Sequence, residues 1–400
     1  MAKKIHSRRV PVRLGPQNSY DIEIGAGALE GLGEVTRAAL SSHARRVVIM
    51  SNSAVFKLYG ARAVRSLRAG GFTVAHWLMS DGERYKSLRM AEQALIFLAE
   101  MKVQRSDAVV ALGGGVVGDL AGFAAALYLR GIAFIQVPTT LLAQIDSSVG
   151  GKTGVNMRRG KNLIGSFHQP HAVVIDTDTL RTLPRRELTA GWCEAIKQGV
   201  VGGRKLFDLT HRALAHDIAA AGVNKARTKG LENDARSIET DGQMAELIAA
   251  QCAFKAMIVA GDEREEMGRT DHRSRRILNF GHTVAHALEA VTAYKRFRHG
   301  EAVGYGMLAA GEISASLGLL NASELESVRA SVRLAGRLPR ADDLDEKAII
   351  GALALDKKAV GGHVQWILLE RIGRARIVSG KEIPPRVVRD SINVALRHRS

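Results

Sequence analysis

The sequence predicts an α/β fold with a mainly parallel sheet in its first part, followed by a mostly α-helical part. Up to about residue 180, short apolar runs alternate with segments of helical period, which is typical of parallel strands covered by helices. One apolar run, residues 107–112, leads directly into the glycine-rich stretch 113–119 and then into a helix. In this order of elements, backbone N–H groups at the start of the helix can hold a pyrophosphate.

The individual elements are expected from periodicity and from cap residues. Ser87 stands where a helix over residues 87–101 needs an N-cap. In the first part we expect strands at 20–24, 46–50, 72–79, 107–112 and 132–137, helices at 55–67, 87–101 and up to 128, and a loop at 146–156. Further on we expect helices within 203–245 and at 301–320, and a strand pair at 364–377.

The composition is that of an ordinary globular protein, with 46% hydrophobic and 24% charged residues among 400. This length allows two or three domains. Two cysteines, Cys193 and Cys252, provide no disulfide framework and indicate a reducing compartment. The basic N-terminus lacks the apolar run of a signal peptide, and the uncharged residues 120–129 are too few to cross a bilayer. We therefore expect a cytoplasmic protein that does not enter a membrane.

The formal net charge of +17 is the most unusual bulk property of the chain. A basic surface can indicate binding to nucleic acid. Here, however, lysine and arginine are spread along the whole sequence with few aromatic residues among them, and no recognition motif accompanies them. We expect no nucleic-acid partner. A positive field would instead concentrate a small polyanionic substrate.

The glycine stretch 113–119 and several basic residues are candidates for phosphate binding. Glycine lets the backbone approach a phosphate closely, although a tight strand–helix turn without a ligand explains the same residues. Lys152 and Lys161 stand in glycine-rich loops, where an ammonium group suits a phosphate. A single such lysine is usually only solvated, but Arg130 and Lys197 recur beside similar loops.

Histidines between residues 279 and 301 suggest a metal site. His282 and His286 are four residues apart, so on a helix they share one face, and His299 follows in an Arg-His-Gly-Glu sequence. Imidazole is a common zinc ligand, and a catalytic zinc keeps three protein ligands and one open position. Two ordinary polar residues on a helix are the alternative interpretation of the pair.

Four segments together resemble the 3-dehydroquinate synthase family. They are GGGVVGDLAGFAA, YLRGIAFIQVPTTLLAQIDSSVGGKTGVN, GKNLIGSFHQP and LNFGHTVAH, and the resemblance extends over residues 20–377. That family belongs with the sugar-phosphate cyclases and is distantly related to iron-dependent alcohol and glycerol dehydrogenases. The resemblance implies an NAD-binding α/β domain at 1–182 and a helical domain that binds metal and substrate at 183–400.

The resemblance also implies two cofactors, NAD and one divalent metal, zinc or cobalt. Glu194, His282 and His299 would be the metal ligands, which separates His282 from His286. The implied NAD contacts are Asp81, Gly82, Glu83, Arg84, Tyr85, Lys86, Gly115, Val116, Val117, Gly118, Asp119, Thr139, Thr140, Lys152, Lys161, Thr179, Leu180, Arg181 and Thr182.

The implied reaction is that of a carbon–oxygen lyase in the shikimate pathway of aromatic amino acid biosynthesis. It converts 3-deoxy-D-arabino-heptulosonate 7-phosphate to 3-dehydroquinate and phosphate, by transient oxidation with NAD, elimination of phosphate, reduction, ring opening and intramolecular aldol closure. A homodimer is typical of the family, and Arg130 would reach the site of the neighbouring subunit. The implied catalytic and substrate-binding residues are Arg130, Asp146, Lys152, Asn162, Lys197, Lys255, Arg275, Asn279, His286 and Lys357, with Lys358 beside it.

Two departures from the family pattern and two alternative functions stay open. The chain has Asn52 and Ala54 where the family has Asp and Asn against the adenosine end of the nucleotide, and extra residues before Arg275 leave Arg273 and Arg276 as alternatives to it. Another sugar-phosphate cyclase, acting on a heptulose phosphate without the carboxylate, is the first alternative function. A metal-dependent polyol dehydrogenase is the second.

Overall fold

The computed structural model describes residues 7–15, 18–157, 160–227, 238–266, 268–356 and 364–397. The chain divides into two compact units, one of Met1–Leu183 with Asp241–Ala260, and one of Pro184–Thr240 with Gly261–Ser400. We call them the sheet unit and the helical unit. Compactness alone does not define separately functioning domains, so the division into domains 1–182 and 183–400 stays a prediction.

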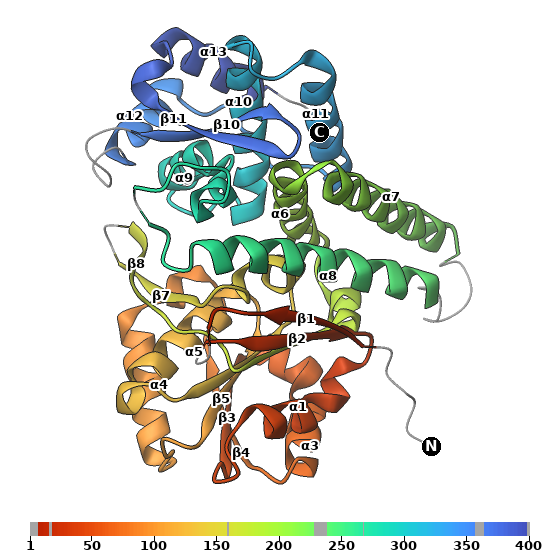
Figure 1. Cartoon of the computed structure of the whole chain (residues 1–400), viewed down its shortest axis with the longest axis vertical. Helices are drawn as coiled ribbons and strands as arrows, with labels where there is room; N and C mark the ends of the chain where they lie inside the picture. Colours follow the sequence, from red (N-terminus) through yellow and green to blue (C-terminus); the bar gives the residue numbers. More distant parts are fainter. Residues whose placement is uncertain are drawn as a thin grey trace. The chain divides into compact units, whose positions relative to one another are not determined.

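A seven-stranded sheet forms the centre of the sheet unit (Figure 1). Neighbouring strands from β2 to β4 run parallel, and only β1 at the edge is antiparallel to its neighbour. This confirms the expected mainly parallel sheet. In spatial order the strands are β1 (Arg8–Val12), β2 (Tyr20–Gly25), β9 (Ala172–Asp176), β6 (Ala133–Pro138), β5 (Ala108–Gly113), β3 (Arg46–Asn52) and β4 (Thr73–Met79).

Helices cover both faces of this sheet, which explains why its central strands are apolar throughout. Along β3, Val48 and Met50 face a core that includes residues of α4 (Leu88–Glu100) and α5 (Gly115–Leu127). Val47 and Ile49 face the opposite core, which includes residues of α1 (Leu32–Ala39) and α3 (Ala61–Ala69). The alternation follows from the two-residue period of a strand.

Most local expectations in this unit are confirmed. The Ser87 side chain accepts a hydrogen bond from the Met90 N–H, as an N-cap should. The helix expected at 55–67 consists of α2 (Ser53–Val55), a π-helical segment (Phe56–Gly60) and α3.

The prediction of a loop at residues 146–156 is wrong. A π-helical segment, Ala143–Ser147, is followed by β7 (Lys152–Met157), which pairs antiparallel with β8 (Gly160–Phe167). A Cβ atom on Gly165 would lie 2.2 Å from the Thr153 carbonyl oxygen, so the strands require small residues for close approach. Those residues hide the alternation that normally reveals a strand. Strands β1 and β9 are also absent from the expected elements.

The helical unit packs long helices around one another and adds a β-hairpin. The hairpin, β10 (Gln365–Arg371) with β11 (Arg374–Ser379), confirms the expected strand pair, and α10 confirms the apolar helix near 301–320. Its helices are α6 (Arg185–Gly202), α7 (Arg204–Arg227), α9 (His282–Val291), α10 (His299–Ser316), α11 (Ala322–Ala335), α12 (Glu346–Asp356) and α13 (Pro385–Leu396).

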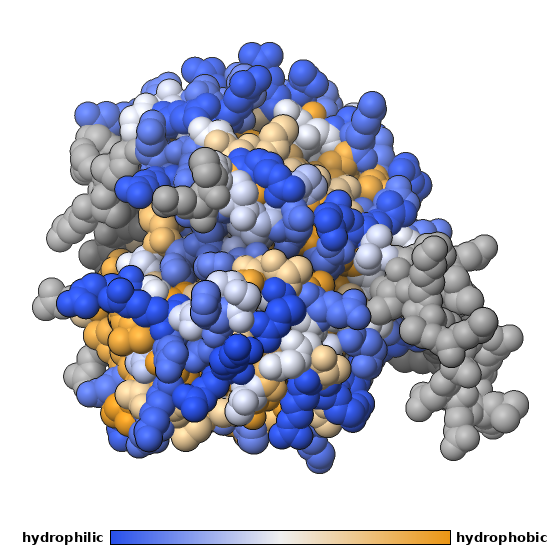
Figure 2. Space-filling view, turned by 60° about the horizontal axis from the view of Figure 1, so that its bottom comes forward, coloured by the Kyte–Doolittle hydropathy of each residue, from blue (hydrophilic) through white to orange (hydrophobic). Residues whose placement is uncertain are grey.

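Helix α8 (Ile238–Gly261) returns the chain to the sheet unit. Within the described residues, its segment Gly242–Gly261 is the one helix that passes a length and composition test for a membrane span. More than half of that segment is buried, as in the core helix of a globular protein. The face in Figure 2 is largely hydrophilic, with smaller hydrophobic areas.

Candidate active site

The predicted NAD-binding segments gather at one edge of the parallel sheet. Each follows the carboxyl end of a strand, and parallel strands end at the same edge. Residues 81–86 follow β4, 115–119 follow β5, 139–140 follow β6, and 179–182 follow β9. This edge is where open α/β sheets bind ligands, but the individual contacts stay a prediction.

The glycine stretch forms a tight turn from β5 into α5. A Cβ atom on Gly114 would lie 3.0 Å from Thr140 Cγ2, and one on Gly118 would lie 2.7 Å from Gln136 Oε1. Packing inside the protein therefore already requires small residues here, and the glycines alone do not indicate a ligand. The stronger indication is the first turn of α5, which no described side chain caps. Its N–H groups and helix dipole suit an anion.

A buried lysine connects this edge to the β7–β8 hairpin. Lys86 is 4% exposed, and its Nζ lies 2.5 Å from Asp119 Oδ2 and 2.5 Å from Asn162 Oδ1. Burial raises the pKa of the Asp119 carboxyl, while Lys86 opposes that rise. Asn162 has a left-handed backbone, with φ of 54°. Two predicted NAD contacts and one predicted substrate contact thus form a single polar cluster.

Other predicted residues of the sheet unit lie in different settings. Lys255 on α8 places its Nζ 2.5 Å from Asp146 Oδ1, and both side chains are largely buried. Lys161 Nζ is 4.0 Å from Glu83 Oε1. Lys152 is exposed at the start of β7. The short ion pair holds the Lys255 ammonium group in place beside Asp146.

Asn52, which departs from the family pattern, has a clear structural role. Its Oδ1 accepts a hydrogen bond from the Val55 N–H at 2.8 Å, and its Nδ2 donates to Asp81 Oδ1 at 2.9 Å. An aspartate could make the first bond but not donate in the second. Asn52 therefore holds the carboxylate of Asp81, while Ala54 is exposed and makes no such bond in the described structure.

Sequence reasoning missed two side chains at this edge. The Tyr59 hydroxyl donates to the Thr179 carbonyl oxygen at 3.2 Å and also bonds Thr182. Gln144 Nε2 donates to Thr179 Oγ1 at 2.9 Å. They fix the segment after β9. Neither stands in a glycine-rich or charged motif, so the sequence contains no signal for them.

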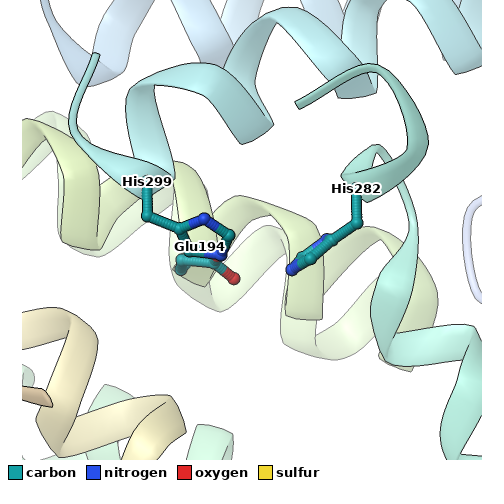
Figure 3. Close-up of side chains that lie close together, drawn as sticks. All are labelled: Glu194, His282 and His299. Carbon is teal, nitrogen blue, oxygen red and sulfur yellow. The ribbon is translucent and has the colours of Figure 1, made fainter. Parts of the chain in front are cut away.

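The predicted metal ligands come together in the helical unit. Glu194 lies on α6, His282 is the first residue of α9, and His299 is the first residue of α10. One ligand atom from each lies within 4.8 Å of the other two. Figure 3 shows the three side chains pointing toward a common centre.

Glycines let these three helices approach backbone to backbone. A Cβ atom on Gly306 of α10 would lie 1.8 Å from the carbonyl oxygen of Gly281, which immediately precedes α9. One on Gly300 would lie 1.9 Å from the Ala190 carbonyl oxygen on α6. Larger residues would push α10 away from both helices, so this packing brings His299 close to the other two ligands.

The environment of Glu194 suits a cation. The carboxylate is completely buried, and neither oxygen has a hydrogen bond of acceptable geometry in the described structure. Two groups lie close as ion partners, Lys197 Nζ at 2.6 Å from Oε2 and His299 Nε2 at 3.5 Å from Oε1. A buried carboxylate without hydrogen bonds is unusual, and a bound metal would satisfy it.

The two histidines are also prepared as ligands. His282 Nδ1 lies 3.3 Å from the Phe280 carbonyl oxygen, an orientation that leaves Nε2 available. Burial, with Lys197 and the neighbouring histidines, holds the pKa of His282 well below its usual value. The ring is therefore neutral near pH 7, as a metal ligand must be. The donor set of one carboxylate and two imidazoles fits zinc or cobalt.

The remaining predicted residues of the helical unit surround this cluster or lie elsewhere. His286 has its ring centre 5.5 Å from that of His282 and 6.2 Å from that of His299, beside the three ligands. Asn279 Nδ2 donates to Glu265 Oε1 at 3.2 Å. Lys357 and Lys358 lie outside the described residues.

Arg275 differs from the neighbouring arginines in its burial. It is 2% exposed and its Nη1 donates to the Glu263 carbonyl oxygen at 2.7 Å. Arg273 is exposed and Arg276 is half-buried. Arg275 is therefore the most firmly held of the three, although its contact with a substrate stays a prediction.

Neither cysteine is arranged as a nucleophile. Both are free and buried. Burial raises the pKa of the Cys193 thiol and raises that of Cys252 to about 12, so neither forms a thiolate near pH 7. Burial and the raised pKa values thus argue against a nucleophilic role for these two thiols.

Comparison with solved structures gives the class of the protein. The fold is similar to ValA, a 2-epi-5-epi-valiolone synthase from Streptomyces hygroscopicus subsp. jinggangensis with NAD+ and Zn2+ bound, with a TM-score of 0.79 and 26% identity over 95% of this chain and 98% of that one. It is also similar to glycerol dehydrogenase from Schizosaccharomyces pombe, with a TM-score of 0.61 and 15% identity over 94% and 88%. The fold thus places the protein in the same fold class as these two enzymes.

The family follows from sequence comparison. Residues 76–190 match the N-terminal and residues 191–359 the C-terminal family model of 3-dehydroquinate synthase. The chain is 41% identical to 3-dehydroquinate synthase of Synechococcus sp. over 96% of this chain and 98% of the relative. It is 44% identical to that of Gloeobacter violaceus over 95% and 97%. The chain belongs to the 3-dehydroquinate synthase family.

Proposed function

We propose that this protein converts 3-deoxy-D-arabino-heptulosonate 7-phosphate to 3-dehydroquinate and phosphate, with NAD and one divalent metal, zinc or cobalt. This is the shikimate-pathway activity of its family. The main support is the match to the family over nearly the whole chain. Glu194, His282 and His299 lie close together with a donor set that fits the metal.

Different residues of the chain bind NAD and the metal. The uncapped first turn of α5 receives the pyrophosphate of NAD. Lys161, another predicted NAD contact, directly precedes Asn162, which belongs to the polar cluster around Lys86. Glu194, His282 and His299 hold the metal. When bound, NAD supplies a hydride acceptor and the metal supplies a Lewis acid.

Basic and polar side chains bind and orient the substrate. Its phosphate and carboxylate are matched by predicted contacts from basic and polar side chains, namely Lys152, Asn162, Lys197, Lys255, Arg275, Asn279 and His286. Holding both anionic ends fixes the reacting carbon atoms and removes much of the entropy cost of reaction. Asp146 in turn fixes the Lys255 ammonium group.

Two alternatives lead to different products. Another sugar-phosphate cyclase would accept a heptulose phosphate without the carboxylate, but Lys255, Asn279 and His286 occupy the positions that bind the carboxylate in this family. A metal-dependent polyol dehydrogenase would release NADH, and the phosphate-binding lysines would then have no role.

One assay separates the three activities. The protein is mixed with NAD, Zn2+ or Co2+, and the heptulosonate phosphate, while phosphate release and NADH absorbance are followed together. We expect phosphate without net NADH, because NAD is regenerated within the cycle. Accumulating NADH would contradict this function in favour of the dehydrogenase, and faster turnover of a heptulose phosphate without the carboxylate would favour the other cyclase. His282→Ala should lose both metal and turnover.

We also infer that the protein is a cytoplasmic homodimer. Exposed apolar side chains stand at the end of α5, just after it and on β8, and we infer that they form one apolar patch, consisting of Leu127, Leu129, Leu163 and Phe167. Burial of such a patch favours association. Just after α5, Leu129 of this patch and its neighbour Arg130 both have left-handed backbones, with φ of 49° and 67°. Arg130 is exposed, as a residue that serves a neighbouring subunit's site would require.

A further inference from the structure

A second buried carboxylate stands beside the metal-ligand cluster. Glu289 on α9 is 2% exposed and lies seven residues after His282, which is about two helical turns. Both of its oxygens lie 3.4 Å from Nδ1 of His299. None of the roles described above includes this residue.

We propose that Glu289 is a positioning residue that fixes the orientation and tautomer of His299. A neutral imidazole has one N–H and one lone pair. The carboxylate accepts the hydrogen bond from Nδ1–H, so the lone pair of Nε2 faces the cluster, where it lies 3.5 Å from Glu194 Oε1. The inference rests on the proposed function, since it assumes that the cluster binds a metal.

The backbone around Glu289 makes it a firm support. Its carbonyl oxygen accepts hydrogen bonds from the Tyr294 N–H at 2.8 Å and from Thr292 Oγ1 at 3.3 Å. These bonds close the end of α9. The backbone of Glu289 is therefore held in place, and this fixes the position from which its side chain reaches the ring of His299.

The two histidine ligands depend on different kinds of partner. His282 Nδ1 faces a backbone carbonyl oxygen, which no side-chain substitution removes. His299 Nδ1 faces a side-chain carboxylate. A carboxylate in this position also makes the imidazole a stronger donor and adds negative charge near the cation. Substitution of Glu289 should therefore weaken one ligand and leave the other intact.

Cobalt binding tests the role directly. The metal-free wild type, Glu289→Gln and Glu289→Ala are titrated with Co2+, and the dissociation constant and visible spectrum are recorded. Glu289→Gln keeps an acceptor oxygen but loses the charge, and we expect roughly tenfold weaker binding. Glu289→Ala also frees the ring, so we expect about 100-fold weaker binding and an altered spectrum. Glu326→Gln on the exposed face of α11 is the matched control and should behave as the wild type.

Each outcome separates this inference from the proposed function. Wild-type affinity and spectrum in both Glu289 variants would overturn the positioning role alone. A wild type that does not bind Co2+ would overturn the metal-dependent function and the inference with it. If the Glu289 variants do not fold, NMR of the zinc-loaded wild type tests the role instead. The role predicts that the ring proton of His299 is on Nδ1. A proton on Nε2 would refute the role.

Discussion

At the residue scale, one half-buried histidine of the sheet unit, His168, makes stability depend on pH. His168 stacks on Phe134 and its Nε2 lies 2.9 Å from the Ile132 carbonyl oxygen. Burial lowers the pKa of His168 below the ordinary value of 6.5. The unfolded chain therefore takes up protons at a higher pH than the folded protein does. The contribution of His168 to stability is complete above about pH 6.5 and is lost as pH falls through its folded pKa.

Urea unfolding between pH 8 and pH 5 should show this loss, at about 1.4 kcal/mol for each unit of pKa depression. His168→Gln removes one titrating group and should flatten the decline. His272→Gln, in an exposed loop, is the control and should not change it. An unchanged pH profile in His168→Gln would show that burial does not suppress protonation of this ring.

The candidate metal ligands show how far spacing in a sequence can identify a site. His282 and His286 are one helical turn apart, so periodicity pointed to the part of the chain that contributes His282 to the candidate ligand cluster. It could not choose between them, because His286 lies beside the ligand group rather than in it. Glu194 comes from a different helix and has no pattern linking it to the histidines. Only the family resemblance suggested it, and Glu289 had no sequence signal at all.

At the scale of elements, the close contact between α9 and α10 should control both stability and metal binding. In Gly306→Ala, the new Cβ would lie 1.8 Å from the Gly281 carbonyl oxygen, which is backbone and cannot rotate away. Overpacking of this kind costs about 1–3 kcal/mol. Because His299 begins α10, we also expect weaker metal binding. Chemical unfolding of the metal-free protein and metal titration measure the two effects separately.

Gly351→Ala is the matched control for this substitution. Gly351 lies within α12, is exposed, and has no atom within 4 Å of a built Cβ. Alanine there should stabilise the protein by about 0.4–1 kcal/mol through the unfolded state. If the two variants had equal free energies of unfolding and equal metal affinities, α10 would accommodate the added methyl group without loss of stability. Glycine at 306 would then not be needed for the site.

The elements that could be predicted are those whose physical signal is local. Alternation of apolar and polar residues identified β2, and apolar runs identified β3, β5 and β6, because strands buried on both faces are apolar throughout. Strand β7 was missed since glycines needed for its close pairing replace the alternating side chains. The assignment of α8 to the sheet unit depends on contacts with residues far away in the chain, such as that of Lys255 with Asp146. Periodicity contains no information on such contacts.

At the scale of the whole molecule, the apolar patch of Leu127, Leu129, Leu163 and Phe167 should determine the oligomeric state. Leu163→Glu with Phe167→Glu places two carboxylates on the exposed face of β8, and like charges meeting across a two-fold interface oppose association. We expect a monomer by sedimentation equilibrium. Leu58→Glu, at an equally exposed leucine outside the patch, should leave the dimer intact. A dimeric double variant would exclude this patch as the interface.

Subunit mixing then tests whether Arg130 acts across that interface. Arg130→Ala and Lys197→Ala should each be inactive alone, because every site in either homodimer lacks one group. In a mixed dimer, the site of the Arg130→Ala subunit has its own Lys197 and receives Arg130 from its partner. Random pairing of equal amounts makes half of all dimers mixed, so about a quarter of the sites should recover activity. Complete absence of recovery, with mixed dimers demonstrated by mass spectrometry, would place Arg130 in its own subunit's site or outside catalysis.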